Sequence, residues 1–208
     1  MRLSKIKHPS GGDVIFDRIS GFLSPEKEDT IEEYFLTVRS RSNNNFPWFY
    51  QTQTVQNSEN TVFDDFGFHT HNFLFEGEIQ SPYMEDIWTL VDLEKFMKEY
   101  GLGDQVYNAH VNLFLQRDRD VIPHPHIDFR KVKHTVILYY VNDCDGDTIF
   151  YNKCENDSLM DAEEWKRESP KKGDFVVFDG SIYHSPCCPV ENRRRCTLNF
   201  DCKVVDIS

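Results

Sequence analysis

Short apolar runs separated by turn-forming residues dominate the chain from residue 107 onward. Apolar or alternating runs of strand length cover 107–115, 121–129, 134–141, 148–151, 175–178, 181–185 and 195–205. Glycine and aspartate separate several of these runs, as in Asp145-Gly146-Asp147 and Asp179-Gly180, and favour tight turns. About seven short strands with turns between them are typical of a sandwich or a jelly roll.

The first half of the chain combines helical and strand patterns. Ser24 and Pro25 are typical of a helix N-terminus, and apolar residues follow them at helical spacing. A second helical region follows Pro82 and is expected to break at Asp92, where the apolar stripe changes register. Short strands are predicted at 13–19, 46–50 and 66–75.

The length of 208 residues favours a single domain. We expect residues 1–106 to supply helices and supporting strands, and residues 107–205 to form a jelly-roll core that holds the functional site. The polar segment 153–169 is expected to be an insertion over one end of the fold. Together with residues 39–81, it is expected to shape a substrate pocket. The predicted fold class is mainly β with packed helices.

The charge and the cysteines narrow the choice of partners and compartment. A net charge of −12 disfavours nucleic acids and anionic membranes. The N-terminus has no apolar signal core and the longest apolar runs are strand-sized, so we expect no membrane association and a cytoplasmic location. None of the six cysteines forms a Cys-x-x-Cys pair, so we expect free, buried thiols.

A histidine and an aspartate lie two residues apart at His126 and Asp128. Because residues i and i+2 of a strand face the same side, both can bind one metal ion. His184, in another predicted strand, can add a second imidazole. This 2-His-1-carboxylate triad holds non-haem Fe(II) and leaves positions open for an organic acid and O2. His69 and His71 also share a strand face, but no third ligand lies nearby, so we expect surface or groove histidines.

Three consecutive arginines precede the last predicted strand. Arg195 abuts the apolar part of this strand and is best placed to point inward, whereas we expect Arg193 and Arg194 to lie at a solvated loop end. A guanidinium binds a carboxylate through two parallel hydrogen bonds. Arg195 is therefore the candidate clamp for an organic acid at the metal, with Arg194 as the alternative.

Together these motifs resemble the Fe(II)- and 2-oxoglutarate-dependent dioxygenases, specifically their prolyl 4-hydroxylase-like branch. The motifs that carry the resemblance, within residues 107–202, are His126-Ile127-Asp128, Leu138-Tyr139-Tyr140-Val141-Asn142, Gly146-Asp147-Thr148, Lys172-Gly173-Asp174, Phe178-Asp179-Gly180, His184 and Arg195. The resemblance implies a cupin-like double-stranded β-helix with helices packed on its major sheet. It also implies Fe(II), O2 and 2-oxoglutarate, which is decarboxylated to succinate, with ascorbate as a further candidate cofactor.

The resemblance also implies roles for individual residues. His126, Asp128 and His184 are the implied metal ligands, and Arg195 is the implied partner of the distal carboxylate of 2-oxoglutarate. Tyr140 is similar to the tyrosine that hydrogen-bonds this carboxylate in hypoxia-sensing prolyl hydroxylases; the alternative is a core aromatic in a buried strand. The expected substrate is a protein or peptide side chain, or a small amino-acid-like metabolite.

The chain departs from the family pattern at three positions. Arg195 stands where the collagen-type members have lysine, so the chain is more similar to the members that use arginine. Gly146-Asp147 retains one glycine of a pair that many relatives have. Phe114 stands where a tyrosine often contacts the cosubstrate, and Asn112 is a weak candidate to replace that contact.

Two alternatives share parts of this ligand set. Asn112-Leu113-Phe114 resembles the Asn-x-Tyr motif of AlkB-type nucleic-acid demethylases, but those enzymes carry a second arginine where this chain has Asp201. A non-catalytic cupin-type metal protein would follow His124-x-His126 closely with glutamate, whereas this chain has Phe129-Arg130. His124 is therefore expected to lie behind the ligands or at the surface.

Overall fold

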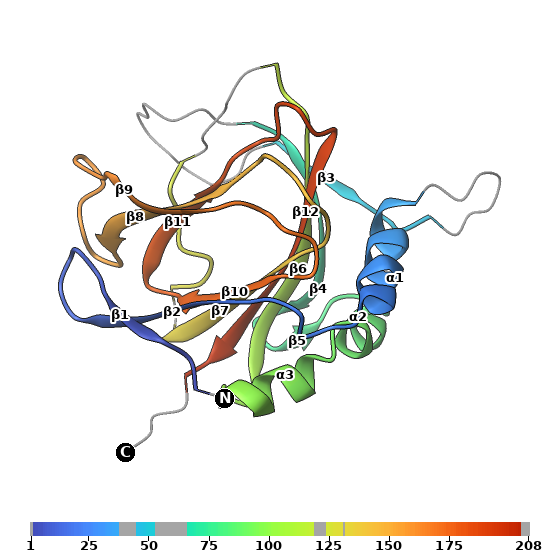
Figure 1. The fold of residues 1–208 in the computed structure, drawn as a ribbon, viewed down its shortest axis with the longest axis horizontal. Helices are drawn as coiled ribbons and strands as arrows, with labels where there is room; N and C mark the ends of the chain where they lie inside the picture. The colour runs from blue at the N-terminus through green and yellow to red at the C-terminus, as the bar shows by residue number, and fades with distance from the viewer. Residues whose placement is uncertain (1, 38–44, 53–65, 119–123, 131, 205–208) are drawn as a thin grey trace.

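The computed structural model describes residues 2–37, 45–52, 66–118, 124–130 and 132–204 of the chain. Two antiparallel sheets face each other, and three helices lie together against the outer face of the larger sheet (Figure 1). The smaller sheet lies on the side of the molecule away from the helices.

The major sheet has the order β1-β2-β10-β7-β12-β6-β4-β3, and β5 pairs with β4. Its strands are β1 (Lys5–Lys7), β2 (Asp13–Ile19), β3 (Phe49–Gln51), β4 (Phe68–Phe75), β5 (Glu78–Ile79), β6 (Val106–Leu115), β7 (His134–Tyr140), β10 (Phe175–Asp179) and β12 (Arg194–Lys203). The minor sheet, in the order β11-β8-β9, consists of β8 (Thr148–Cys154), β9 (Glu164–Glu168) and β11 (Ile182–Pro186). From β7 onward the chain passes repeatedly between the sheets, which confirms the predicted jelly roll.

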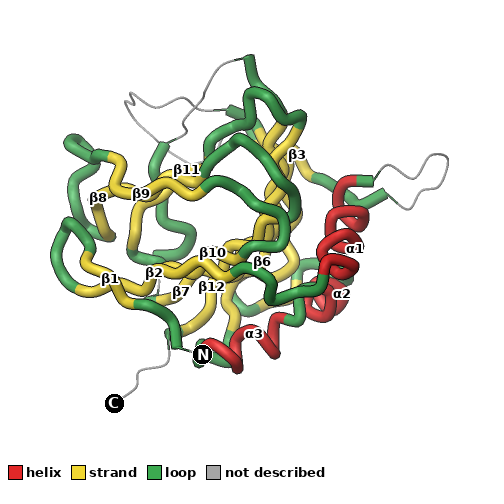
Figure 2. Tube along the Cα trace, in the orientation of Figure 1, coloured by secondary structure: helices red, strands yellow, loops and turns green. Residues whose placement is uncertain are grey.

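The helices begin and end close to the predicted positions. They are α1 (Pro25–Leu36), α2 (Met84–Leu90) and α3 (Leu93–Tyr100), and Figure 2 shows all three on one side of the strands. The side chain of Ser24 caps α1 by accepting a hydrogen bond from the backbone N–H of Lys27. Asp92 has a φ of +49° and separates α2 from α3, as its position between two apolar stripes predicts. Within the described residues, no helix is long and apolar enough to cross a membrane.

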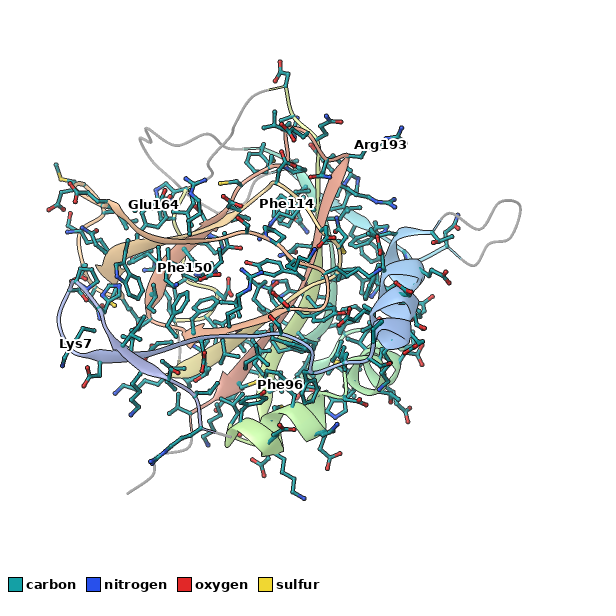
Figure 3. All side chains as sticks on the ribbon, viewed as in Figure 1. Lys7, Phe96, Phe114, Phe150, Glu164 and Arg193 are labelled. Carbon is teal, nitrogen blue, oxygen red and sulfur yellow. The ribbon has the colours of Figure 1, made fainter. Side chains whose placement is uncertain are left out.

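Strand β7 explains how the core is divided between two layers. Ile137 and Tyr139 pack in the layer beneath the helices, whereas Leu138 and Tyr140 pack in the layer between the two sheets. Phe96 of α3 stacks on an aromatic ring of β10 and so joins α3 to the major sheet (Figure 3). Because both faces of β7 are covered, all of its residues are buried, and its apolar and aromatic run from Val136 to Tyr140 is continuous rather than alternating.

Three local predictions are wrong. Residues 124–130 form a loop with a single β-bridge rather than the strand expected over 121–129, and residues 119–123 lie outside the described part. Pro125 has no backbone N–H to donate to a ladder, which disfavours a regular strand there. Segment 153–169 is not merely an insertion, because β9 completes the minor sheet at its edge, where polar residues are tolerated. The expected strand 46–50 is reduced to β3.

A partly buried ion-pair cluster connects the two sheets at one end. Arg18 of β2 donates from Nε to Asp174 Oδ2 (2.7 Å) and from Nη1 to Glu168 Oε2 (2.9 Å). Glu168 ends β9 in the minor sheet, and Asp174 directly precedes β10 in the major sheet. Both acidic residues are buried, so their charges depend on this arginine and on Lys166, which also binds Glu168.

Candidate functional site

The structure brings His126, Asp128 and His184 together at one end of the space between the sheets. One potential ligand atom from each residue lies within 4.8 Å of the others. Asp128 Oδ1 is 3.3 Å from His126 Nε2 and 3.5 Å from His184 Nε2. Two imidazole nitrogens and one carboxylate oxygen therefore lie close enough together to bind one metal ion.

Backbone hydrogen bonds hold the two histidines opposite each other. His126 N–H donates to His184 O (2.9 Å), and His184 N–H donates to His126 O (3.0 Å). His184 Nδ1 lies 3.2 Å from Ile182 O, and because a carbonyl oxygen only accepts, Nδ1 must carry the proton. Nε2 is then left with a lone pair directed at the site, which is the tautomer that a metal-binding histidine needs.

The carboxyl group of Asp128 is prepared to bind a cation. Burial opposes its ionisation, but the neighbouring imidazoles, His184 first and then His126, outweigh burial and hold the pKa of Asp128 well below its usual range. Asp128 Oδ2 is buried and has no hydrogen-bond partner. An ionised, incompletely satisfied carboxylate beside two imidazoles fits a divalent metal ion, and this donor set suits Fe(II).

Arg195 lies in the same cavity and is almost completely buried, with 2% of its surface exposed. Its Nη2 donates to Thr148 Oγ1 (2.8 Å), and its Cζ lies 5.4 Å from the centre of the Phe114 ring. Its Nε is buried without a hydrogen-bond partner, and no carboxylate of the described residues pairs with it. A buried guanidinium without a counter-ion is costly, so the geometry fits an anionic ligand such as one carboxylate of 2-oxoglutarate.

The glycine retained at position 146 permits this packing. A Cβ added to Gly146 would lie 2.7 Å from Cys187 O and 3.1 Å from Arg195 Cδ. Backbone and guanidinium chain therefore approach too closely for any larger residue. Asp147, which replaces the second glycine of the family motif, instead pairs with Arg167 at 3.3 Å.

The neighbouring arginines point elsewhere. Arg194 Nη1 donates to Leu36 O at the end of α1 (2.9 Å), and Arg193 is exposed. Of the three arginines, Arg195 is the one that lines the cavity. The alternation of side chains along β12 accounts for this choice, because Arg194 and Arg195 must face opposite sides of the sheet.

Tyr140 lies behind the cavity rather than at its surface. Its hydroxyl lies 2.8 Å from Thr148 Oγ1, the same oxygen that accepts from Arg195, and the residue is fully buried. Burial, opposed by Arg195 and by the Thr148 hydrogen bond, raises the pKa of Tyr140 to about 12, so the phenol keeps its proton. Direct contact of Tyr140 with a cosubstrate stays a prediction, and its observed contact is with Thr148.

The cavity has a volume of about 510 Å³ and a polar floor that the sequence motifs did not reveal. Side chains of β4, β6 and β12 that line it and carry a polar group, apart from Arg195, are Thr70, Asn72, Asn108, His110, Asn112, Thr197, Asn199 and Asp201. The pairing of β12 with β6 sets Asn199 beside His110 and Asp201 beside Asn108. In the sequence, polar residues occupy every second position in the middle of β6 and along β12, and this alternation could have predicted the polar floor.

Two groups in this floor respond to the triad. Burial lowers the pKa of His110, while Asp128 raises it and His126 and His184 lower it further, so the ring is neutral. Burial and then the charge of Asp128 raise the pKa of Asp201 well above its usual range, although a hydrogen bond from a neighbouring amide opposes the shift.

His69 and His71 do not line the cavity that contains the triad. His71 is buried, with Nδ1 against Pro47 O (2.8 Å) and Nε2 against Ser81 Oγ (2.7 Å), so the expected surface or groove position is wrong for this residue. His69 lies on the same face of β4, opposite the face that lines the cavity. The six cysteines all lie in the described residues and form no disulfide, and five of them are buried, as predicted.

No protein-family model matches the chain, and no curated protein matches it. Solved structures do match. An oxidoreductase of the 2OG-Fe(II) oxygenase family from Burkholderia pseudomallei is 11% identical with a TM-score of 0.60, covering 91% of this chain and 84% of that one. A prolyl-4-hydroxylase from Pseudomonas putida is 15% identical with a TM-score of 0.53, covering 90% and 92%.

A third match is a prolyl hydroxylase from Trichoplax adhaerens, in complex with a peptide fragment of the hypoxia inducible factor oxygen degradation domain. It is 14% identical with a TM-score of 0.55, covering 91% of this chain and 83% of that chain. At these identities the likeness shows the fold. The chain has the fold of the 2-oxoglutarate- and Fe(II)-dependent oxygenases, the group that its motifs resemble.

Proposed function

We propose that this protein, which has the fold of the 2-oxoglutarate- and Fe(II)-dependent oxygenases, is itself such an oxygenase. One observation carries the proposal. A single cavity contains both the converging atoms of His126, Asp128 and His184 and the buried guanidinium of Arg195, which lacks an acidic partner among the described residues. A metal site alone would not require a buried cation, and an anion site alone would not require the triad.

The cavity offers two binding positions, one for the metal and one for the cosubstrate. The Nε2 atoms of His126 and His184 and a carboxylate oxygen of Asp128 would hold the metal, and the carboxylate would offset part of its charge. Fe(II) bound there supplies O2 activation coupled to oxidation of 2-oxoglutarate. The isolated β-bridge between residues 126 and 184 fixes the separation of the two imidazoles, whose ring centres are 4.7 Å apart.

The cosubstrate position lies at the Arg195 end of the cavity. Arg195 would bind the distal carboxylate, and Thr148 fixes the guanidinium through the hydrogen bond at Nη2. The ring of Phe114 supports the guanidinium from one side and keeps water from that face. Because these contacts exist before any ligand binds, little side-chain order has to be gained on binding.

We propose hydroxylation of a side chain in a protein or peptide, or of a small amino-acid-like molecule, as the reaction. The prolyl hydroxylase neighbour from Trichoplax adhaerens, which binds a peptide, supports a peptide substrate. Gln51, Phe68 and Phe75 also line the cavity, and Phe75 is half exposed. A cavity lined by apolar as well as polar side chains is suited to a substrate that enters by one side chain.

The experiment that tests this function measures succinate. Purified protein is incubated in air with Fe(II) and 2-oxoglutarate, and succinate is quantified with and without proline-containing peptides. Turnover that is absent in Asp128→Ala and present in His124→Ala is the expected result. His124 is the matched control because it lies two positions from His126 without belonging to the converging group. Equal succinate in the unaltered protein and in Asp128→Ala would refute the proposal.

A further inference from the structure

The inward face of β12 carries a cation at one end and an acid at the other. Arg195, Thr197, Asn199 and Asp201 occupy alternate positions, and all four line the cavity. At about 3.3 Å per residue, Arg195 and Asp201 are separated by roughly 20 Å of strand. The proposed cosubstrate position uses the Arg195 end, so the opposite end is available to a second molecule.

The carboxylate of Asp201 is buried and only half satisfied. It is 1% exposed, and its Oδ2 accepts a hydrogen bond from Asn108 Nδ2 at 2.9 Å. Its Oδ1 has no hydrogen-bond partner, and neither lysine nor arginine of the described residues pairs with it. Burial and the charge of Asp128 disfavour the ionised form of this carboxyl group and raise its pKa, so a cationic donor supplied by a ligand in the cavity would favour the ionised form and be stabilised by it.

The nearest basic group does not supply that donor. His134 Nε2 lies 4.0 Å from Asp201 Oδ1, which is beyond hydrogen-bond distance. His134 Nδ1 lies 3.0 Å from Val132 O and therefore carries the ring proton, which leaves Nε2 of the neutral ring as an acceptor. At this separation the two atoms form no hydrogen bond whichever of them carries a proton, so Asp201 Oδ1 remains without a partner.

Asn108 holds the carboxyl group of Asp201 in one orientation. Asn108 Oδ1 accepts from the backbone N–H of Glu76 (2.9 Å), and this contact fixes the amide so that its Nδ2 points at Asp201. Glu76 belongs to the turn between β4 and β5, where its φ is +51°. The carboxylate is thus oriented by the scaffold before a ligand binds.

A second acceptor lies next to it on the same strand. Asn199 is 7% exposed, lines the cavity, and its Oδ1 is buried without a hydrogen-bond partner. It pairs with His110 across the strands, and His110 faces the triad. Asn199 and Asp201 therefore each present an acceptor oxygen without a partner on the face of β12 that lines the cavity.

We infer that Asp201 and Asn199 form the subsite for the primary substrate, and that this substrate carries a cationic nitrogen group with several N–H donors, an ammonium or a guanidinium. This inference rests on the proposed function, because it assigns the other end of the cavity to the cosubstrate. The net charge of −12 favours the approach of such a cation. A basic side chain in a peptide and the α-ammonium of a free amino acid are the two sources of this group.

The test compares probes that carry a cation on the side chain, on the α-nitrogen, or nowhere. The unaltered protein is loaded anaerobically with Fe(II) and 2-oxoglutarate and titrated calorimetrically with Nα-acetyl-L-lysine amide, Nα-acetyl-L-norleucine amide and free L-norleucine. Binding of the lysine derivative identifies a basic side chain as the source. Binding of free norleucine alone identifies an α-ammonium. The doubly blocked norleucine derivative carries no cation and is expected not to bind.

The variant Asp201→Asn tests the residue itself, because it keeps the shape and removes the charge. The bound cation is expected to lose roughly 10- to 150-fold in affinity, since hydrogen bonds to charged groups contribute about 1.5–3 kcal/mol. Asp86→Asn, an exposed carboxylate on α2, is the matched control and is expected to bind the probe as the unaltered protein does.

The outcomes separate this inference from the proposed function. If the Fe(II)–2-oxoglutarate absorption band never forms in the unaltered protein, both fail. If the band forms but no cationic probe binds, or the blocked norleucine derivative binds equally well, the inference is overturned while the proposed function stands. Unchanged affinity in a loaded Asp201→Asn protein overturns it as well. If that variant does not fold, the probe comparison in the unaltered protein still decides.

Discussion

At the scale of single residues, the site depends on charged groups that lack some of their hydrogen-bond partners. These groups are the carboxylate of Asp128 and the guanidinium of Arg195. His126, Asp128 and Arg195 were identifiable from the sequence because their types and order restrict the chemistry. The polar partners Thr148 and Asp201 could not be assigned, since their roles depend on which strands lie opposite each other. Spacing along the chain indicates which residues share a face, but not what faces them.

Loss of one triad residue is expected to abolish metal binding. In His126→Ala or Asp128→Ala, one ligand of three is removed, and the affinity for Fe(II) should fall by more than the about 10- to 100-fold typical of residues that only support a ligand. Anaerobic equilibrium dialysis measures this affinity. His124→Ala, the control, should bind Fe(II) like the unaltered protein, and retention of Fe(II) by both triad variants would refute the assigned ligands.

Loss of Arg195 is expected to act on the cosubstrate rather than on the metal. Arg195→Ala removes a charge-assisted clamp worth about 1.5–3 kcal/mol, so the 2-oxoglutarate requirement should rise roughly 10- to 150-fold. The dependence of succinate formation on 2-oxoglutarate concentration measures the effect. Arg194→Ala is the matched control, since Arg194 contacts Leu36 O outside the cavity. A larger rise in the control than in Arg195→Ala would move the clamp to Arg194.

At the scale of elements, the apolar pattern predicted the strands that are buried and missed those that are not. Strand β7 is continuous in its apolar residues and was assigned correctly, whereas β9 is polar because it lies at the edge of the minor sheet. The segment around His126 was expected to be a strand, yet one bridge to His184 suffices to place both side chains. Backbone pairing at a single point cannot be predicted from an alternating pattern.

The ion pairs of Arg18 are expected to stabilise the junction between the sheets. Arg18→Met leaves the buried carboxylates of Glu168 and Asp174 without this partner, so the free energy of unfolding should fall by about 3 kcal/mol. Urea denaturation measures it. Lys7→Met, which breaks the exposed pair of Lys7 with Asp13, should cost only about 0–1 kcal/mol. Equal losses in both variants would show that burial of the carboxylates is unimportant.

At the scale of the whole molecule, the cavity lies between the two sheets, and the helices pack on the opposite face of the major sheet. The jelly roll was predictable because strand number and turn spacing restrict the possible architectures. The helices cover only the outer face of the major sheet, which leaves its inner face free to supply the polar floor (Figure 1). The depth and lining of the cavity could not be predicted, because both depend on the register between strands that are distant in sequence.

The overall charge leads to a prediction about nucleic acids. With a net charge of −12 and Asp201 in the cavity floor, the protein should not retain single-stranded DNA or RNA even at low salt, where electrostatic binding is strongest. Electrophoretic mobility of labelled oligonucleotides measures retention. Retention at low salt that disappears as salt is added would instead favour the AlkB-type alternative.

The central claim is that one cavity binds Fe(II) and 2-oxoglutarate together. Anaerobic titration of the metal-free protein with Fe(II) and then 2-oxoglutarate tests it most directly, through the weak visible charge-transfer band of the chelate. The band is expected in the unaltered protein, and it should be missing in His184→Ala and in Arg195→Ala at the same 2-oxoglutarate concentration. Metal binding without any such band in the unaltered protein would contradict the claim and indicate a structural or differently catalytic metal site.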